Sequence, residues 1–143
     1  MAQLSNVSVE RLLLLLANYG QAVSKAIAAV SPDAELANNV SLIVLCTLDL
    51  DGPRRPGVLQ ELTGLSSGGV SKLLDRMEQA GVVKRTYGGV PGDNRGVLVS
   101  ITRRGKSLAG RFSAAVAAQL PDAKTMVDAL AAAVATTATR LTV

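Results

Sequence analysis

The apolar positions near the N-terminus recur every three or four residues, which is the spacing of one face of a helix. They are Leu12, Leu13, Leu16, Tyr19, Val23, Ile27 and Val30. This stripe predicts a first helix from about Val7 to Val30. Leu14 and Leu15 add apolar surface on another side, so we expect a neighbouring element or a partner subunit to cover this helix on more than one face.

The segment Ser31-Pro32-Asp33 interrupts the helical pattern and predicts the start of a second helix. Ser31 is expected to be its N-cap and Pro32 to occupy its first helical position, where the missing amide hydrogen of proline does no harm. The apolar residues that follow predict that this helix runs to about Leu50.

Two short helices joined by a glycine turn are predicted in the middle of the chain. The first covers Gly57 to Thr63 and ends at Gly64, where a left-handed backbone is tolerated. The second is capped by Ser66 or Ser67 and ends at Gly81. Its inward stripe is Val70, Leu73, Leu74 and Met77. Two helices separated by so short a turn indicate a helix-turn-helix.

A long β-hairpin is predicted after the helix-turn-helix. Its strands are the β-rich runs Val82 to Thr86 and Val97 to Ile101, and the segment between them is dense in turn formers. Thr102 is expected to cap a fifth helix, and Pro121-Asp122 to start a sixth one. Both ends of the chain are therefore expected to be helical.

These elements define the predicted fold class, which is mainly α with a small β-hairpin wing (α+β). We expect one domain over residues 1–143, with a winged helix-turn-helix core at about residues 52–105. The helical segments 1–50 and 106–143 are expected to form N- and C-terminal dimerisation helices. The ends would then assemble a homodimer while the middle binds DNA.

The charge distribution supports a polyanion partner. Residues 52–111 hold eleven Lys or Arg against four acids, a local balance of +7, while the rest of the chain is acidic. A localised basic region is typical of a nucleic-acid surface, although a merely solvated basic face would have the same charge. The chain has only three aromatic residues, which argues against single strands, whose bases stack on aromatic rings. Duplex DNA has no such requirement.

Several function classes lose support from what the sequence lacks. It has no histidine and only one cysteine, Cys46, so disulfides and Cys/His zinc sites within one chain are excluded, and no metal or cofactor is expected. The commonest general base is missing, and no phosphate-binding glycine motif is present, so we do not expect an enzyme. No leader peptide is indicated, and the apolar runs are shorter than a bilayer requires, which predicts a cytoplasmic protein without a membrane partner.

Cys46 has two interpretations. An exposed thiol with a stabilised thiolate would be a candidate oxidant sensor. The residue lies in the apolar run Leu42 to Leu48 with no nearby base, and this favours a buried core thiol.

The candidate DNA contacts come from the outward side of the fourth helix and from cations next to it. The expected recognition-helix residues are Ser67, Gly68, Ser71, Lys72 and Arg76. Among them, Ser71 and Lys72 are the candidates for base edges, because the N-terminal part of such a helix enters the major groove. The expected phosphate contacts are Arg54, Arg55, Lys84 and Arg85.

Two stretches of the sequence resemble the winged-helix core of the MarR family of transcription regulators. They are LTGLSSGGVSKLLDRMEQAGVVKR, from Leu62 to Arg85, and DNRGVLVSITRRGK, from Asp93 to Lys106. The helix-turn-helix, the Asp-x-Arg pair in the wing and the Val-x-Val-x-Ile-Thr-x-x-Gly pattern at the end of the second strand follow one another in this order. Together they cover about half of the chain. The sequence departs from the family at Gln60, where a small alanine is common, and in its Gly-rich wing.

The resemblance implies a homodimer, joined through its terminal helices, that binds a two-fold DNA site with two recognition helices. It also implies that repression is the commoner outcome and that a small-molecule effector, often aromatic or phenolic, controls binding. In the wing, Arg95 is expected to enter the minor groove, where arginine is favoured. Asp93 would orient Arg95 or tether Arg76, unless Asp93 serves only the turn and Arg95 is solvated. The alternative function is a protein-binding module whose basic face meets an acidic partner.

Overall fold

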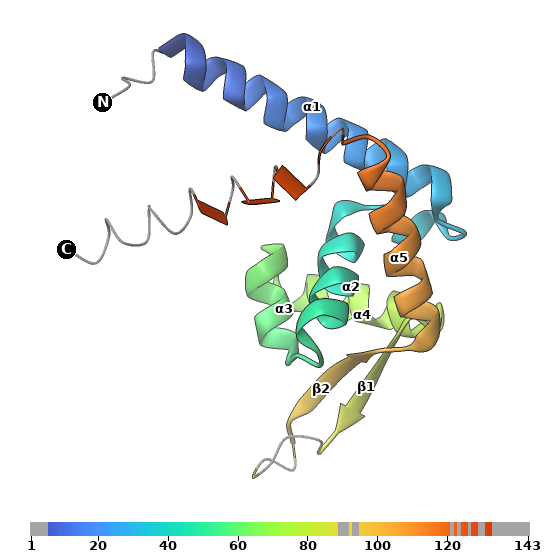
Figure 1. The fold of residues 1–143 in the computed structure, drawn as a ribbon. Coiled ribbons are helices and arrows are strands. Elements are labelled where there is room, and N and C mark those ends of the chain that lie inside the picture. Colours follow the sequence, from blue (N-terminus) through green and yellow to red (C-terminus); the bar gives the residue numbers. More distant parts are fainter. Residues whose placement is uncertain are drawn as a thin grey trace, which may run out of the picture.

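The computed structural model describes residues 6–88, 92, 95–120, 122, 124–125, 127–128 and 131–132. Helices surround a small core, and a two-stranded sheet projects from one end of the molecule (Figure 1). The predicted fold class is therefore confirmed. In chain order the elements are α1 (Asn6–Val30), the 3-10 turn η1 (Ala34–Leu36), α2 (Asn39–Asp51), α3 (Pro56–Thr63), α4 (Ser67–Gln79), β1 (Val83–Tyr87), β2 (Val97–Ile101) and α5 (Arg103–Ala117).

Helix α1 is tied to the rest of the molecule by its C-terminal half. Ile27 is fully buried in the core there, and the helix packs against α5 and α2. The other half extends beyond the globular part (Figure 1), and Leu13 to Leu16 are all exposed, by between 49% and 62%. The segment Leu13–Val30 has a mean hydropathy of 1.3 and could cross a membrane by length and composition alone. The expectation that every apolar run is shorter than a bilayer requires therefore does not hold for this segment, of which only the C-terminal part packs on α5.

The connection between α1 and α2 differs from the prediction. Ser31 does not cap the second helix, because its hydroxyl donates to the carbonyl oxygen of Asp33. The Asp33 side chain accepts from the backbone of Glu35 and starts η1, whereas Asn38 accepts from the amide of Ser41 and starts α2. Asp and Asn cap helices as well as Ser does, so later residues took the role that the sequence analysis assigned to Ser31.

The helix-turn-helix forms as predicted. Gly64 has a φ of +70°, the left-handed conformation that ends α3 without the steric cost that a side chain would bring. The Ser66 side chain accepts a hydrogen bond of 3.1 Å from the amide of Gly69 and caps α4. The predicted inward stripe of α4 is buried, and its residues are Val70, Leu73, Leu74 and Met77.

The two strands form an antiparallel hairpin that is held at its base and at the middle of β2. The register pairs Val83 with Ile101 at the base. Arg54 exchanges two backbone hydrogen bonds with Val99, of 3.0 and 2.8 Å, and so joins the sheet from the segment before α3. Thr102 donates from its amide to Val82 and from its hydroxyl to the carbonyl of Gly81, at 3.1 and 2.6 Å.

Helix α5 closes the core, and Thr102 caps it as predicted by accepting from the amide of Gly105. Its buried side includes Leu108, Ala109 and the fully buried Phe112, and the helix packs against α1 and α2. The predicted sixth helix lies largely outside the described residues. Residues 124–125, 127–128 and 131–132 are helical, and Lys124 forms an ion pair with Asp128 at 2.7 Å.

Candidate nucleic-acid interface

The outer side of α4 is polar and exposed along its whole length. The exposed residues are Ser67, Gly68, Ser71, Lys72, Asp75 and Arg76. The opposite side of the same helix is buried against the core, so the helix is rigidly held while its polar side faces solvent. The five residues predicted for the recognition helix therefore come together on one open surface.

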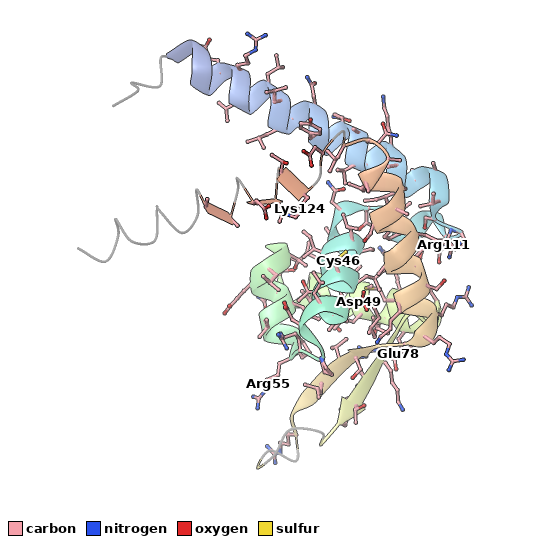
Figure 2. The ribbon with its side chains drawn as sticks, in the orientation of Figure 1. Cys46, Asp49, Arg55, Glu78, Arg111 and Lys124 are labelled. Carbon is pink, nitrogen blue, oxygen red and sulfur yellow. The ribbon has the colours of Figure 1, made fainter. Side chains whose placement is uncertain are left out.

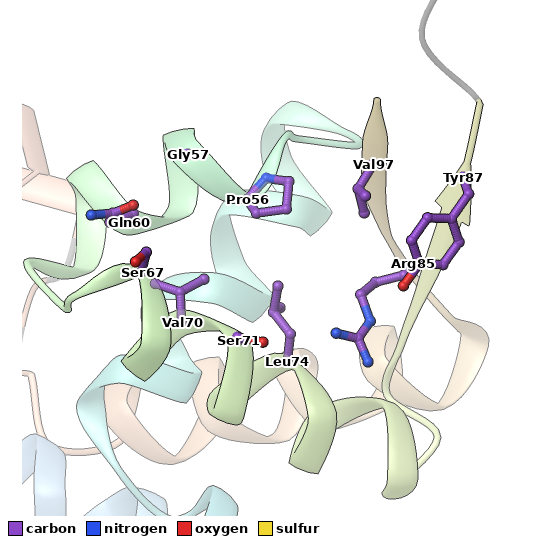
Figure 3. A pocket seen from close by; sticks show the side chains of 10 residues that line it. All are labelled: Pro56, Gly57, Gln60, Ser67, Val70, Ser71, Leu74, Arg85, Tyr87 and Val97. Carbon is purple, nitrogen blue, oxygen red and sulfur yellow. The ribbon is translucent and has the colours of Figure 1, made fainter. Parts of the chain in front are cut away.

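A cleft of about 270 Å³ lies between this helix, α3 and the wing. Its floor is apolar and includes Val70, Leu74 and Val97, and its sides include Gln60 and Ser71 (Figure 3). Helices α3 and α4 and the hairpin thus form one concave surface. In the sequence Gln60 stands out only as a departure from a family pattern, yet its side chain lines this surface.

Tyr87 was also missed as a residue of this surface. It ends β1, lines the same cleft and is 71% exposed. The sequence did contain a signal for this residue, because Tyr87 is one of only three aromatic residues and directly follows the first predicted strand.

Arg85 lies differently from the prediction that it contacts phosphate. Its Nε donates to Glu78 Oε2 and its Nη2 donates to Asp75 Oδ1, each at 2.6 Å. Its guanidinium points from β1 toward α4 (Figure 3), and the side chain is only 20% exposed. Hydrogen bonds to Asp75 and then to Glu78 raise the pKa of Arg85. In the structure the guanidinium of Arg85 is therefore bound by two carboxylates of the same chain.

The other cations differ in how much they are already engaged. Arg54 donates to the carbonyl of Pro53 at 3.0 Å and lies 4.0 Å from Asp51. Lys84 and Arg55 are exposed, and Arg55 lies at the end of the molecule that carries the wing (Figure 2).

On α4 itself, Arg76 is half exposed and lies 3.9 Å from Glu35. This loose pair leaves the guanidinium on the open surface, beside Lys72.

The wing tip is described only in part. Arg95 is exposed, as a contact to DNA would require. Asp93 lies outside the described residues, and so does its predicted pairing with Arg95 or Arg76.

Cys46 lies half-buried in α2, among the side chains that α5 covers (Figure 2). Burial raises the pKa of the Cys46 thiol and the charge of Asp49 adds to this, whereas a hydrogen bond with Ser113 opposes it. This environment disfavours a reactive thiolate. In the part of the chain that is described, no three His, Cys, Asp or Glu side chains gather in the way a metal ion requires.

Neither the known family models nor the curated proteins contain a match to the sequence. Solved structures do match. One is the transcriptional repressor CouR bound to a 23-mer DNA duplex, with a TM-score of 0.69 and 21% identity over 96% of this chain and 99% of that one. Another is a mutant of MarR from E. coli complexed with operator DNA, with a TM-score of 0.65 and 20% identity over 90% and 92%.

The chain has the MarR fold. The resemblance that the sequence motifs indicated is thereby confirmed at the level of the fold. A third solved structure with the MarR fold is BpsR from Bordetella bronchiseptica, whose DNA binding is regulated by 6-hydroxynicotinic acid; it has a TM-score of 0.61 and 20% identity over 87% of this chain and 98% of that one. Within the MarR fold of this chain, α4 is the second helix of the helix-turn-helix and β1 with β2 is the wing.

Proposed function

We propose that this protein is a sequence-specific regulator of transcription that binds double-stranded DNA as a homodimer and acts as a repressor. The observation that carries the proposal is the exposed polar and cationic side of α4, which lies beside a projecting wing. Solved proteins of the same fold are bound to DNA in the CouR and MarR structures. The same neighbours support the expectation that the chain is not an enzyme.

In this proposal each group of residues has its own role at the duplex. Ser71 and Lys72 contact base edges in the major groove, and Ser67, Gly68 and Arg76 contact the same groove or its rim. Arg55 and Lys84 bind phosphates, and Arg54 adds charge behind them. Arg95 enters the adjacent minor groove, with Asp93 as the residue that orients it.

The homodimer follows from the leucines of α1. Four consecutive residues of a helix point to all of its sides, and here all four, Leu13 to Leu16, are leucines that the described part of the chain leaves exposed. A second copy would cover them. Two copies related by a two-fold axis would place two recognition helices on a pseudo-palindromic site, with half-sites roughly 10 base pairs apart.

The domain organisation and the cellular setting remain part of the proposal. Residues 52–105 would form the DNA-binding core, and residues 1–50 with 106–143 the dimerisation region. Control by a small-molecule effector is supported by BpsR, whose fold is the same. A regulator of transcription acts where the DNA is, which agrees with the predicted cytoplasmic location.

The test is a selection of bound sequences from random duplex DNA with the purified full chain. We expect an imperfect palindrome whose half-sites are about one helical turn apart. A strictly asymmetric selected site would contradict the dimer on DNA. Failure to enrich any sequence, at low as well as physiological salt, would favour the alternative of a protein-binding module instead.

A further inference from the structure

The recognition helix carries two carboxylates on the side that faces the wing. Asp75 and Glu78 are one helical turn apart, so both can be reached by a single side chain from a neighbouring strand. Their side chains are 55% and 39% exposed, and Asp75 belongs to the same outer surface as Lys72 and Arg76. Left without partners, these carboxylates would repel the phosphates of bound DNA.

Arg85 spans both carboxylates. Its planar guanidinium uses two different nitrogens, Nε for Glu78 and Nη2 for Asp75, and both donor–acceptor distances are 2.6 Å. Charge-assisted hydrogen bonds from two nitrogens of one rigid fork fix orientation as well as distance. They therefore connect the middle of β1 to the last turns of α4.

Other attachments that hold the wing lie at its base and on its other strand. Val83 pairs with Ile101 next to the base, and Arg54 holds β2 through Val99. Arg85 lies opposite Val99 in the register, so its guanidinium attaches β1 to α4 at the level where Arg54 holds β2, and a two-stranded ribbon alone is only marginally stable. The guanidinium of Arg85 is thus placed where it can limit how far the wing swings away from α4.

We propose that Arg85 is a positioning residue, which sets the angle between the wing and the recognition helix by binding Asp75 and Glu78 and does not itself contact DNA. This inference rests on the proposed function, because positioning the wing matters only if the protein binds DNA. The link between β1 and α4 itself is present without DNA. It also explains two acidic residues on a DNA-binding face, since they orient the wing.

The first experiment uses the free protein and needs no DNA. Amide hydrogen exchange is measured along β1 and β2 in the parent, in Arg85→Gln and in the control Lys84→Gln, which removes the neighbouring exposed cation. We expect exchange in both strands to be about tenfold faster in Arg85→Gln, because the wing opens more often as a unit, and unchanged in Lys84→Gln. Unchanged exchange at α2 and α5 shows that the fold is retained. Equal exchange in all three proteins would overturn the proposal.

The second experiment measures binding to the selected duplex at several salt concentrations, with footprinting. Lys84→Gln should lower the salt slope by about one and keep the footprint. Arg85→Gln should keep the parent salt slope, lose protection at the flank read by the wing, and discriminate roughly tenfold less between selected and scrambled duplexes. A lower salt slope with an intact footprint in Arg85→Gln would mean that Arg85 binds phosphate, and the proposal would be wrong.

A third variant makes charge and geometry predict different outcomes. Asp75→Asn/Glu78→Gln removes two negative charges from the DNA face and releases Arg85, so charge alone predicts tighter binding to every duplex alike and unchanged discrimination. Positioning requires faster exchange in the free wing and lower discrimination, as in Arg85→Gln. If the parent binds no DNA at all, the proposed function fails, while the exchange experiment still decides whether Arg85 holds the wing.

Discussion

Lys72 and Arg55 are both exposed cations, yet their positions give them different tasks. Lys72 lies on the outer side of α4, whereas Arg55 precedes α3 at the end that carries the wing. We expect Lys72→Ala to lower affinity and to change the preferred base at one position in each half-site. Arg55→Ala should weaken all duplexes alike and reduce the salt slope by about one. Repeating the selection and the salt titration with each variant checks this.

The two outcomes are separable because base contacts carry sequence information and phosphate contacts do not. Should both variants shift only the overall affinity, Lys72 would have been assigned to the wrong part of the duplex.

Cys46 illustrates how burial decides chemistry at a single residue. Because burial raises the pKa of its thiol, the thiolate that reacts with peroxide is rarer at neutral pH than for an exposed cysteine. We expect the parent and Cys46→Ser to give the same DNA-binding curve with and without peroxide. The raised pKa also predicts that modification by a thiol reagent accelerates only at a higher pH than for a free cysteine. Peroxide-driven release that disappears in the variant would establish a sensor.

At the scale of elements, the contact between α5 and the turn before β1 leaves no room for a side chain. A Cβ added at Gly105 would collide with the carbonyl oxygen of Val82 and lie 2.7 Å from Ile101 Cγ1. We expect Gly105→Ala to lower the free energy of unfolding by about 1 to 3 kcal/mol, because backbone has to move. Urea unfolding followed by circular dichroism measures this change.

The matched control lies on the same helix. A Cβ at Gly110 would meet nothing within 4 Å, so Gly110→Ala should leave stability unchanged or raise it by up to about 1 kcal/mol through helix propensity. If both substitutions lowered the free energy of unfolding equally, the loss of stability at Gly105 would come from replacing a glycine in this helix and not from a collision with Val82.

The elements that could be predicted are those whose signals are local. The stripe of α4 and the caps Ser66 and Thr102 involve residues within four positions of one another, so the sequence contains them in full. The start of α2 was wrong because Ser31 and Asn38 are equally good caps, and only packing chooses between them.

The ion pairs of Arg85 could not be predicted for a different reason. Its partner Asp75 lies ten residues away on another element, and their meeting depends on the angle at which the hairpin leaves α4. A cation next to a predicted DNA-binding helix is therefore assigned to phosphate by default. The part of the site on the outer side of α4 was predictable, because helical periodicity alone separates buried from exposed positions.

For the whole molecule, the exposed leucines of α1 make assembly the main expectation. We predict that the chain sediments as a dimer at micromolar concentration and that Leu14→Asp/Leu15→Asp shifts it to a monomer. Burying one leucine contributes about 1.5 to 3 kcal/mol, so losing two should raise the dimer dissociation constant at least about tenfold. Sedimentation velocity over a range of concentrations measures this.

Leu50 provides the control, because it is 82% exposed at the end of α2, away from the leucines of α1. Leu50→Asp should remain a dimer. A parent chain that stays monomeric at micromolar concentration would refute the predicted assembly, and dissociation by Leu50→Asp would place the interface elsewhere.

The hydrogen bonds at the base of the wing determine which insertions and sequence exchanges the hairpin can accept. Thr102 donates from its amide to Val82 and from its hydroxyl to Gly81, so the hairpin leaves and re-enters the core at adjacent points. Because its ends are already held together, each doubling of the tip length costs only about 0.6 kcal/mol in loop-closure entropy. Tips of other lengths and compositions can therefore be grafted between Tyr87 and Val97, while Arg85 keeps its bonds to α4 and Val99 stays in the core.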